Sequence, residues 1–167
     1  MPAPSVPKLQ LEQVSMTFET KDGKHFSALS PVDLIVEPGR FVSLIGPSGC
    51  GKSTIFNIVA GLQLPTSGRV MLDGVDATGM IGQVGYMLQK DLLLPWRTVL
   101  DNVALGMEIR GITTRAARER ALPFLERYGL GGFEYQYPSS LSGGMRQRAA
   151  LLRTLLVDED VVLLDEP

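Results

Sequence analysis

Hydrophobic and polar residues alternate over the first part of the chain, a pattern typical of strands with one buried face. The alternation runs over residues 9–18 and changes phase near Gln13, where we expect a local irregularity. After a polar turn at 21–24, a second alternating segment at 32–36 ends at a Pro-Gly pair. These segments predict a small antiparallel sheet.

Two short segments are apolar or nearly so: Phe41–Ile45, which only Ser43 interrupts, and Val161–Leu164. Continuous apolar runs of this length are typical of strands buried on both faces of a parallel sheet. Further strands are predicted at Arg69–Leu72 and Val84–Leu88. The combination predicts an α/β fold with a parallel sheet at its core and the antiparallel sheet beside it.

Apolar residues recur at helical spacing in four segments: 53–60, 98–110, 114–128 and 143–157. Gly61 should end the first of these helices. Pro123 lies inside the third, so that helix should either be kinked there or begin later. We therefore expect a helical subdomain at about 91–157, inserted in one domain that spans 1–167.

Composition limits the classes of function. The chain has 167 residues, of which 44% are hydrophobic and 20% charged, enough for one folded domain. The formal net charge of -2 provides no basic surface for nucleic acid. No apolar run reaches the ~18–20 residues of a membrane helix, so we expect any membrane role to be peripheral. The single cysteine, Cys50, cannot form a disulfide within the chain.

The segment Gly46–Ser53 fits the pattern G-x-x-x-x-G-K-[ST] of a phosphate-binding loop, the Walker A motif. Glycines let the backbone curl so that successive N–H groups point at phosphate oxygens, and the following helix adds its positive N-terminus. Lys52 would place a cation on the β- and γ-phosphates, and the Ser53 hydroxyl would ligate Mg²⁺. The residues expected to bind ATP here are Gly46, Pro47, Ser48, Gly49, Cys50, Gly51, Lys52, Ser53 and Thr54.

The apolar run at 161–164 is followed directly by Asp165 and Glu166. At the end of a buried strand, both carboxylates would lie at the edge of the sheet where ligands of α/β proteins bind. Asp165 would help to hold Mg²⁺, and Glu166 would orient or deprotonate the water that attacks the γ-phosphate. Alone, this pattern also fits a solvated loop. Together with the phosphate loop, it predicts a hydrolytic site.

A second candidate anion site is Leu141–Arg148, with the sequence Leu-Ser-Gly-Gly-Met-Arg-Gln-Arg. Ser142 can cap the predicted helix, and Gly143-Gly144 exposes backbone N–H groups at its positive end. The order of phosphate loop, Gln89, Leu-Ser-Gly-Gly and Asp-Glu resembles the nucleotide-binding subunits of ATP-binding cassette (ABC) transporters over almost the whole chain. Met145 departs from the commoner Gln, which leaves the Ser cap and both glycines intact.

The resemblance implies a P-loop NTPase fold with a RecA-like parallel core, an antiparallel β subdomain and a helical subdomain. It implies that Phe18 stacks on adenine, although Phe18 also fits a core position in its strand. Gln89 would contact Mg²⁺ and sense the γ-phosphate, so it joins Lys52 and Glu166 as a catalytic candidate. Ser142-Gly143-Gly144 would contact the γ-phosphate held by a second subunit, in a head-to-tail dimer that encloses two ATP molecules.

A more local resemblance concerns Leu93–Val99 and Asp101–Val103, which are similar to the branch serving bacterial importers of nitrate, sulfonate, taurine and related solutes. The implied partners are transmembrane permease subunits and, indirectly, a solute-binding protein, at the cytoplasmic face of the inner membrane. Trp96 would then contact the permease, or alternatively pack in the core. The resemblance does not specify the solute.

The family pattern continues after Glu166 with a loop that carries an Asp and a strand end that carries a His. The only histidine here, His25, precedes the phosphate loop. We therefore interpret the sequence as a C-terminally incomplete subunit that alone binds ATP weakly and hydrolyses it negligibly. Two alternatives stay open, a non-transport ABC ATPase and an ATP-binding fragment without turnover. Lys52 and Ser142 are 142 − 52 = 90 positions apart, without heptads or cysteine pairs, which argues against chromosome-organising and DNA-repair members.

Overall fold

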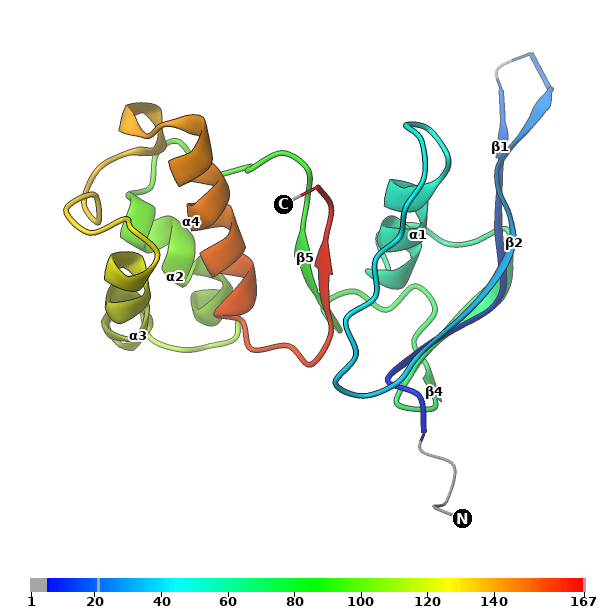
Figure 1. Cartoon of the computed structure of the whole chain (residues 1–167), viewed down its shortest axis with the longest axis horizontal. Coiled ribbons are helices and arrows are strands. Elements are labelled where there is room, and N and C mark those ends of the chain that lie inside the picture. The colour runs from blue at the N-terminus through cyan, green and yellow to red at the C-terminus, as the bar shows by residue number, and fades with distance from the viewer. Residues whose placement is uncertain (1–5, 21, 167) are drawn as a thin grey trace. The chain divides into compact units, whose positions relative to one another are not determined.

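The computed structural model describes residues 6–20 and 22–166, which fall into two compact units, 1–84 and 85–167 (Figure 1). Residues 1–5, 21 and 167 lie outside the described residues. Both ends of the predicted domain and one residue of the predicted turn at 21–24 are therefore among the residues that the structure does not describe. The extent of a single domain over 1–167 stays a prediction.

The first unit is built on a four-stranded antiparallel sheet in the order β2-β1-β3-β4. A long hairpin joins β1 (Leu9–Glu19) to β2 (His25–Val36), and β1 pairs on its other edge with β3 (Ser67–Leu72), which pairs with β4 (Val75–Asp76). Helix α1 (Lys52–Val59) contacts β2 and ends before Gly61, which has a positive φ as a helix stop requires.

The predicted irregularity in the first strand is present. Gln13 has a positive φ of 48°, and the register of β1 against β2 shifts between Leu11 and Val14. The Gln13 N–H donates to Asp33 Oδ1 at 2.8 Å, so the backbone group that leaves the regular ladder still has a partner. Leu11 and Val14 are both buried, with 1% and 0% exposed. Because the alternation in the sequence shifts by one residue at Gln13, the apolar residues before and after the irregularity both stay buried.

The apolar run at 41–45 does not form the buried strand that its pattern predicts. Among the described residues no strand pairs with it, and Phe41 and Ile45 are 88% and 95% exposed. A buried parallel strand needs hydrogen-bonding neighbours on both sides. The other apolar run finds a partner within the second unit, where β6 (Val162–Leu164) lies parallel to β5 (Gly85–Met87). The described parallel sheet therefore consists of β5 and β6.

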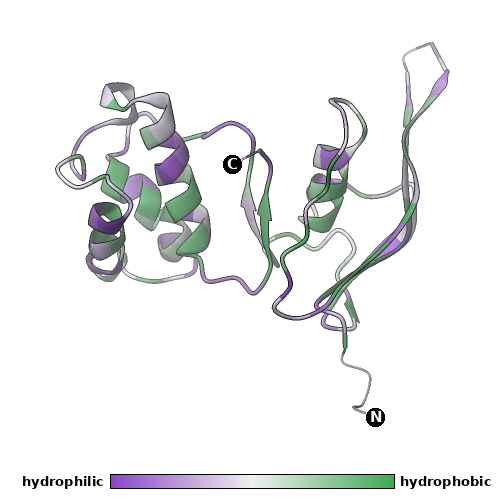
Figure 2. Cartoon of the chain, in the orientation of Figure 1, coloured by the Kyte–Doolittle hydropathy of each residue, from purple (hydrophilic) through white to green (hydrophobic). Residues whose placement is uncertain are grey.

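The second unit combines this parallel pair with α2 (Val99–Ile109), α3 (Thr114–Arg127), a 3₁₀ turn at Pro138–Ser140 and α4 (Gly143–Leu155). Helix α2 packs on both α3 and α4, and Figure 2 shows the hydrophobic stretches of α2 and α4. Helix α3 runs through Pro123, so the alternative of a later start is wrong. Across the described part of the chain, no helix combines the length and hydrophobicity that crossing a bilayer requires.

Asn102 is a fully buried polar residue that organises the segment before α2. Its Oδ1 accepts from the N–H of Leu94 at 2.7 Å, and its Nδ2 donates to the carbonyls of Leu94, Arg97 and Thr98 at 3.0–3.1 Å. One side chain thus fixes the loop that carries Trp96. Trp96 is 72% exposed, so the alternative that it packs in the core is wrong.

Asn102→Leu should lower the free energy of unfolding of the second unit by roughly 2–4 kcal/mol, because it leaves buried backbone groups without partners. Urea unfolding followed by the fluorescence of Trp96, the only tryptophan of the chain, measures the effect. Gln136→Leu, at an exposed amide side chain, is the matched control and should stay within about 0.5 kcal/mol. Equal stability of the two variants would contradict the role of Asn102.

Candidate nucleotide-binding site

The predicted site residues are divided between the two units. The first unit holds Phe18 and the loop at 46–54, and the second holds Gln89, the segment at 142–144 and the acidic pair at 165–166. The proximity of the acidic pair to the phosphate loop therefore stays a prediction. The geometry within each unit is defined.

In the first unit, the glycine-rich loop leads directly into α1. Gly49 and Gly51 have positive φ values of 80° and 98°, a conformation that disfavours any side chain. A Cβ atom on Gly51 would also lie 3.0 Å from the carbonyl oxygen of Ala28 in β2. Gly51 thus allows the end of the loop to approach the sheet closely, which positions the start of α1.

The N-terminus of α1 has no side-chain cap, whereas α2, α3 and α4 each begin at a capping hydroxyl. Gly51 is the N-cap residue, and the first intrahelical bond runs from Ile55 N–H to Gly51 O at 2.9 Å. The N–H groups of Lys52, Ser53 and Thr54 therefore have no acceptor within the helix. Together with the helix dipole, they form a positive end that favours an anion.

The ammonium group of Lys52 lies within the same loop. Its Nζ donates to the carbonyls of Gly46 and Pro47 at 2.8 and 3.0 Å, with Cys50 Sγ 3.8 Å away. Within residues 6–20 and 22–166, no carboxylate forms an ion pair with Lys52. An uncompensated cation, free N–H donors and a curled backbone together suit the phosphate groups of a nucleotide.

Phe18 lies near the turn end of β1 and is 41% exposed. The alternative that it is a core residue is therefore wrong. Its proposed contact with adenine stays a prediction, and its exposed ring leaves a face available for stacking.

In the second unit, Gln89 and Glu166 are brought together although the sequence separates them widely. Gln89 Nε2 donates to Glu166 Oε2 at 2.6 Å. The Asp165 N–H donates to the carbonyl of Met87 at 3.0 Å, which continues the parallel ladder of β5 and β6. The pairing of the two strands thus places an amide and two carboxylates at their carboxyl ends, where α/β proteins bind ligands.

Asp165 is almost buried, with 6% exposed. Burial, and then the negative charge of Asp165, raise the pKa of Tyr86 to about 12. The phenol therefore stays protonated and neutral at physiological pH.

The donor set fits a magnesium ion only in part. The predicted ligands Ser53, Gln89 and Asp165 offer oxygen atoms, which Mg²⁺ prefers, but they supply one carboxylate. In the part of the chain that the structure describes, no group of three or more His, Cys, Asp or Glu could hold a metal. Such a mixed set is typical of Mg²⁺ that is bound jointly with substrate phosphates.

The start of α4 has the predicted cap. Ser142 Oγ accepts from the N–H of Met145 at 3.3 Å. A Cβ atom on Gly144 would meet nothing within 4 Å, and one on Gly143 would meet only the guanidinium of Arg146 at 3.9 Å. Neither glycine has a positive φ. Glycine costs a helix about 1 kcal/mol relative to alanine, and no contact among the described residues requires this pair. The pair therefore suits close approach by another molecule.

Gln147 is a site residue to which the sequence analysis gave no role. Its Nε2 donates to the backbone carbonyl of Glu166 at 3.1 Å. Glu166 itself has a positive φ of 52°, which is unfavourable for a non-glycine residue. This contact from α4 supports that conformation. The two residues are far apart in sequence, so no local signal could have indicated the bond.

Two arginines of α4 hold the segment that follows Gln89. Arg146 Nε forms an ion pair with Asp91 Oδ2 at 3.1 Å. Arg153 donates to the carbonyls of Asp91 and Leu92 at 2.6 and 2.8 Å. Their seven-residue spacing puts both arginines on one face of the helix, and this is the only signal that the sequence offered.

Comparison with known proteins supports a nucleotide site. The profile of a family described as ABC transporter matches residues 29–167. The chain is 54% identical to an aliphatic sulfonates import ATP-binding protein of Rhodococcus jostii, over 84% of this chain and 54% of the relative. It is 46% identical to an Fe(3+) ions import ATP-binding protein of Brucella abortus, over 92% of this chain and 45% of that relative. It is 44% identical to a taurine import ATP-binding protein of Pseudomonas aeruginosa, over 96% of this chain and 60% of that relative. The chain thus spans 45–60% of the length of these relatives.

Solved structures give the same result for the fold. A dimeric bacterial ABC transporter cassette has a TM-score of 0.85 at 32% identity, over 94% of this chain and 73% of that chain. A post-hydrolysis state of the cassette, bound to ADP and Pi, has a TM-score of 0.84 at 33% identity with the same coverage. These likenesses confirm the predicted P-loop NTPase fold class.

The close approach of the phosphate loop to β2 can be tested with two glycine variants. Gly51→Ala should lower the free energy of unfolding of the first unit by roughly 1–3 kcal/mol, because the methyl group combines a positive φ with a contact to Ala28. Gly49→Ala is the matched control, since its φ is positive but its Cβ would be in open space. This variant should lower the free energy of unfolding by only about 1 kcal/mol. Urea unfolding followed by circular dichroism compares them. If both variants lost the same stability, the contact with β2 would not be the constraint.

Proposed function

The chain belongs to the ABC transporter family, and from this premise we propose that it binds and hydrolyses ATP to drive import of a small solute across the bacterial inner membrane. The observation that carries the proposal is the uncapped start of α1, with the ammonium of Lys52 beside it, which has no carboxylate partner among the described residues. A polyanion satisfies both features at once. The names of the import relatives and their nucleotide-bound structural counterpart support the choice of ATP.

In the proposed complex, the loop at 46–54 encloses the phosphates and Lys52 neutralises the γ-phosphate. Phe18 contacts the adenine ring. Mg²⁺, held by Ser53, Gln89 and Asp165 with the phosphates, would offset the charge that develops on the phosphate oxygens.

Glu166 is the proposed general base. The oxygen of a water molecule attacks the γ-phosphorus in line while the bond to the β–γ bridging oxygen breaks, so ADP leaves with the bond electrons. Glu166 accepts the proton of the water. The hydrogen bond from Gln89 to one carboxylate oxygen supports this role, because it fixes the carboxylate and leaves the other oxygen for the water.

We propose that two copies act as a head-to-tail dimer. Ser142, Gly143 and Gly144 of one subunit would contact the γ-phosphate bound by the other. The exposed glycine pair, which no contact among the described residues requires, supports this arrangement, as does the dimeric state of the structural neighbour.

Permease subunits at the cytoplasmic face of the inner membrane are the proposed further partners, with a solute-binding protein acting indirectly. The exposed Trp96 on its fixed loop supports a docking role. Nitrate, a sulfonate or taurine is the proposed solute class. The Fe(3+) relative has an identity comparable to that of the taurine relative, so uptake assays with labelled solutes must decide between them.

Glu166→Gln in the full-length protein should reduce the hydrolysis rate at least about 100-fold, the usual scale for loss of a general base. ATP binding should remain, because the phosphate loop is intact. Lys52→Ala should lose both binding and hydrolysis. Calorimetric ATP binding and phosphate release measure the two effects. A Glu166→Gln protein with normal turnover would contradict the base assignment.

Gly144→Ala should lower the ATP hydrolysis rate without lowering the stability of the fold. The methyl group meets none of the described residues within 4 Å, and alanine favours the helix, so the free energy of unfolding should be unchanged or raised by up to about 1 kcal/mol. Hydrolysis by the dimer should nevertheless fall, because the methyl group obstructs the approach of the second subunit's nucleotide. Undiminished hydrolysis at saturating ATP would show that no molecule approaches Gly144 closely.

A further inference from the structure

We infer that Phe26 provides a second aromatic ring of the base-binding surface, beside Phe18, for the adenine of a bound nucleotide. The inference rests on the proposed function, because it adds a residue to the nucleotide site proposed there. All the residues that support it belong to the first unit, whose internal geometry is defined.

Phe18 and Phe26 are directly opposite each other in the antiparallel pair of β1 and β2. Side chains of directly opposed residues project from the same face of a sheet, with Cβ atoms about 4.5–5.5 Å apart. Phe18 is 41% and Phe26 60% exposed. The two rings thus form one exposed aromatic surface near the turn of the hairpin.

A β-bulge decides which face of the hairpin carries Phe26. The register changes by one residue between consecutive pairs, from Met16–Leu29 to Thr17–Ser27 and then Phe18–Phe26. Ala28 is therefore the extra residue of β2. Simple alternation along β2 would place Ser27 on the same face as Leu29. The bulge reverses the alternation, so Phe26 shares the face of Leu29.

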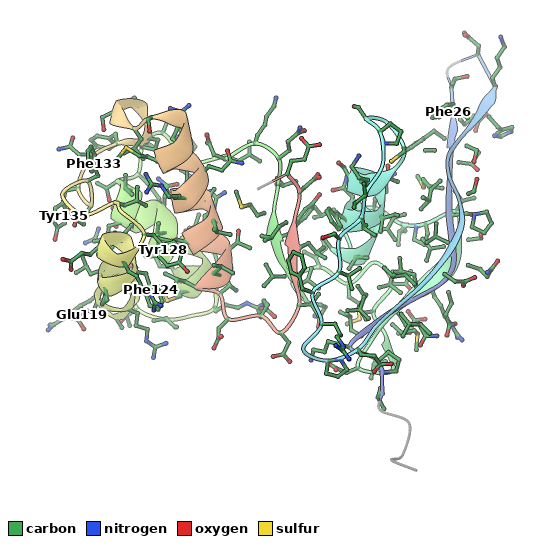
Figure 3. All side chains as sticks on the ribbon, in the orientation of Figure 1. Phe26, Glu119, Phe124, Tyr128, Phe133 and Tyr135 are labelled. Carbon is green, nitrogen blue, oxygen red and sulfur yellow. The ribbon has the colours of Figure 1, made fainter. Side chains whose placement is uncertain are left out.

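That face is the one nearest the phosphate loop. Leu29 Cδ1 lies 3.3 Å from the Cβ position of Gly51, and the carbonyl oxygen of Ala28 lies 3.0 Å from it. Leu29 and Phe26 are opposite Met16 and Phe18, which are two residues apart in β1, a rise of about 7 Å. Figure 3 shows Phe26 on the side of the hairpin along which the cyan loop runs. A ligand with its phosphates on the loop can therefore reach both rings with its base.

The chemistry of the two rings suits a flat heterocycle. Phenylalanine offers an aromatic face and no hydrogen-bond donor, so it recognises the π-face of a base rather than its edges. Both rings also leave a large part of their apolar surface in contact with water. A base stacked on Phe18 and in contact with Phe26 would remove apolar surface of both rings from water.

The test compares ATP with inorganic tripolyphosphate, which carries phosphates without a base, as ligands of the full-length protein in isothermal titration calorimetry. Phe26→Leu should raise the Kd for ATP about five- to tenfold, in line with the loss of one aromatic contact to a base, and leave the Kd for tripolyphosphate unchanged. Phe26→Tyr should keep the affinity for ATP. Ile35→Ala, at a 58% exposed apolar residue of the same strand, is the matched control and should change neither Kd.

Three results would overturn the inference. An unchanged Kd for ATP in Phe26→Leu, with Lys52→Ala still weakening both ligands, would remove Phe26 from the site and leave the proposed function standing. If Phe26→Leu weakened the binding of ATP and of tripolyphosphate equally, the substitution would act on the phosphate loop and not on a contact with the base. If Lys52→Ala weakened neither ligand, the proposed function itself would fail.

Discussion

The positive N-terminus of α1 is the constraint on which the rest of the account depends. A helix start without a capping side chain leaves N–H donors without acceptors in the helix. The ammonium of Lys52 at the same place, bonded to carbonyls and to no carboxylate among the described residues, adds a positive charge. The backbone is shaped to maintain this arrangement, since Gly49 and Gly51 occupy conformations that other residues avoid. An anion with several oxygens resolves these unfavourable features together, which is why the loop is best understood as a phosphate site.

Helix α4 has the corresponding organising role in the second unit. Its first turn is capped by Ser142 and carries two exposed glycines. Further along, Gln147 binds the backbone of Glu166, and Arg153 binds the carbonyls that follow Gln89. Helix α4 therefore carries the candidate phosphate contact at its start and, further along, contacts the segments that hold the candidate base and its amide partner.

The sequence predicted features that local interactions determine. The cap at Ser142, the helix that begins after Thr98 and the irregularity at Gln13 all follow from residues close in the chain. The run at 41–45 was predicted wrongly as a buried strand, because apolarity alone does not supply hydrogen-bonding partners. The Gln147–Glu166 bond was not predicted, because it joins segments that meet only after folding. The proximity of the acidic pair to the phosphate loop stays a prediction, because it depends on long-range packing.

The most direct test of the central claim is an NMR titration that follows the backbone amides of this chain as Mg-ATP is added. The account predicts saturable downfield shifts of the Lys52, Ser53 and Thr54 amide protons, because these donors gain phosphate acceptors. The same shifts should be lost when Lys52 is replaced by Ala. Amides of this segment that stay unchanged while ATP binds elsewhere on the chain would contradict the account.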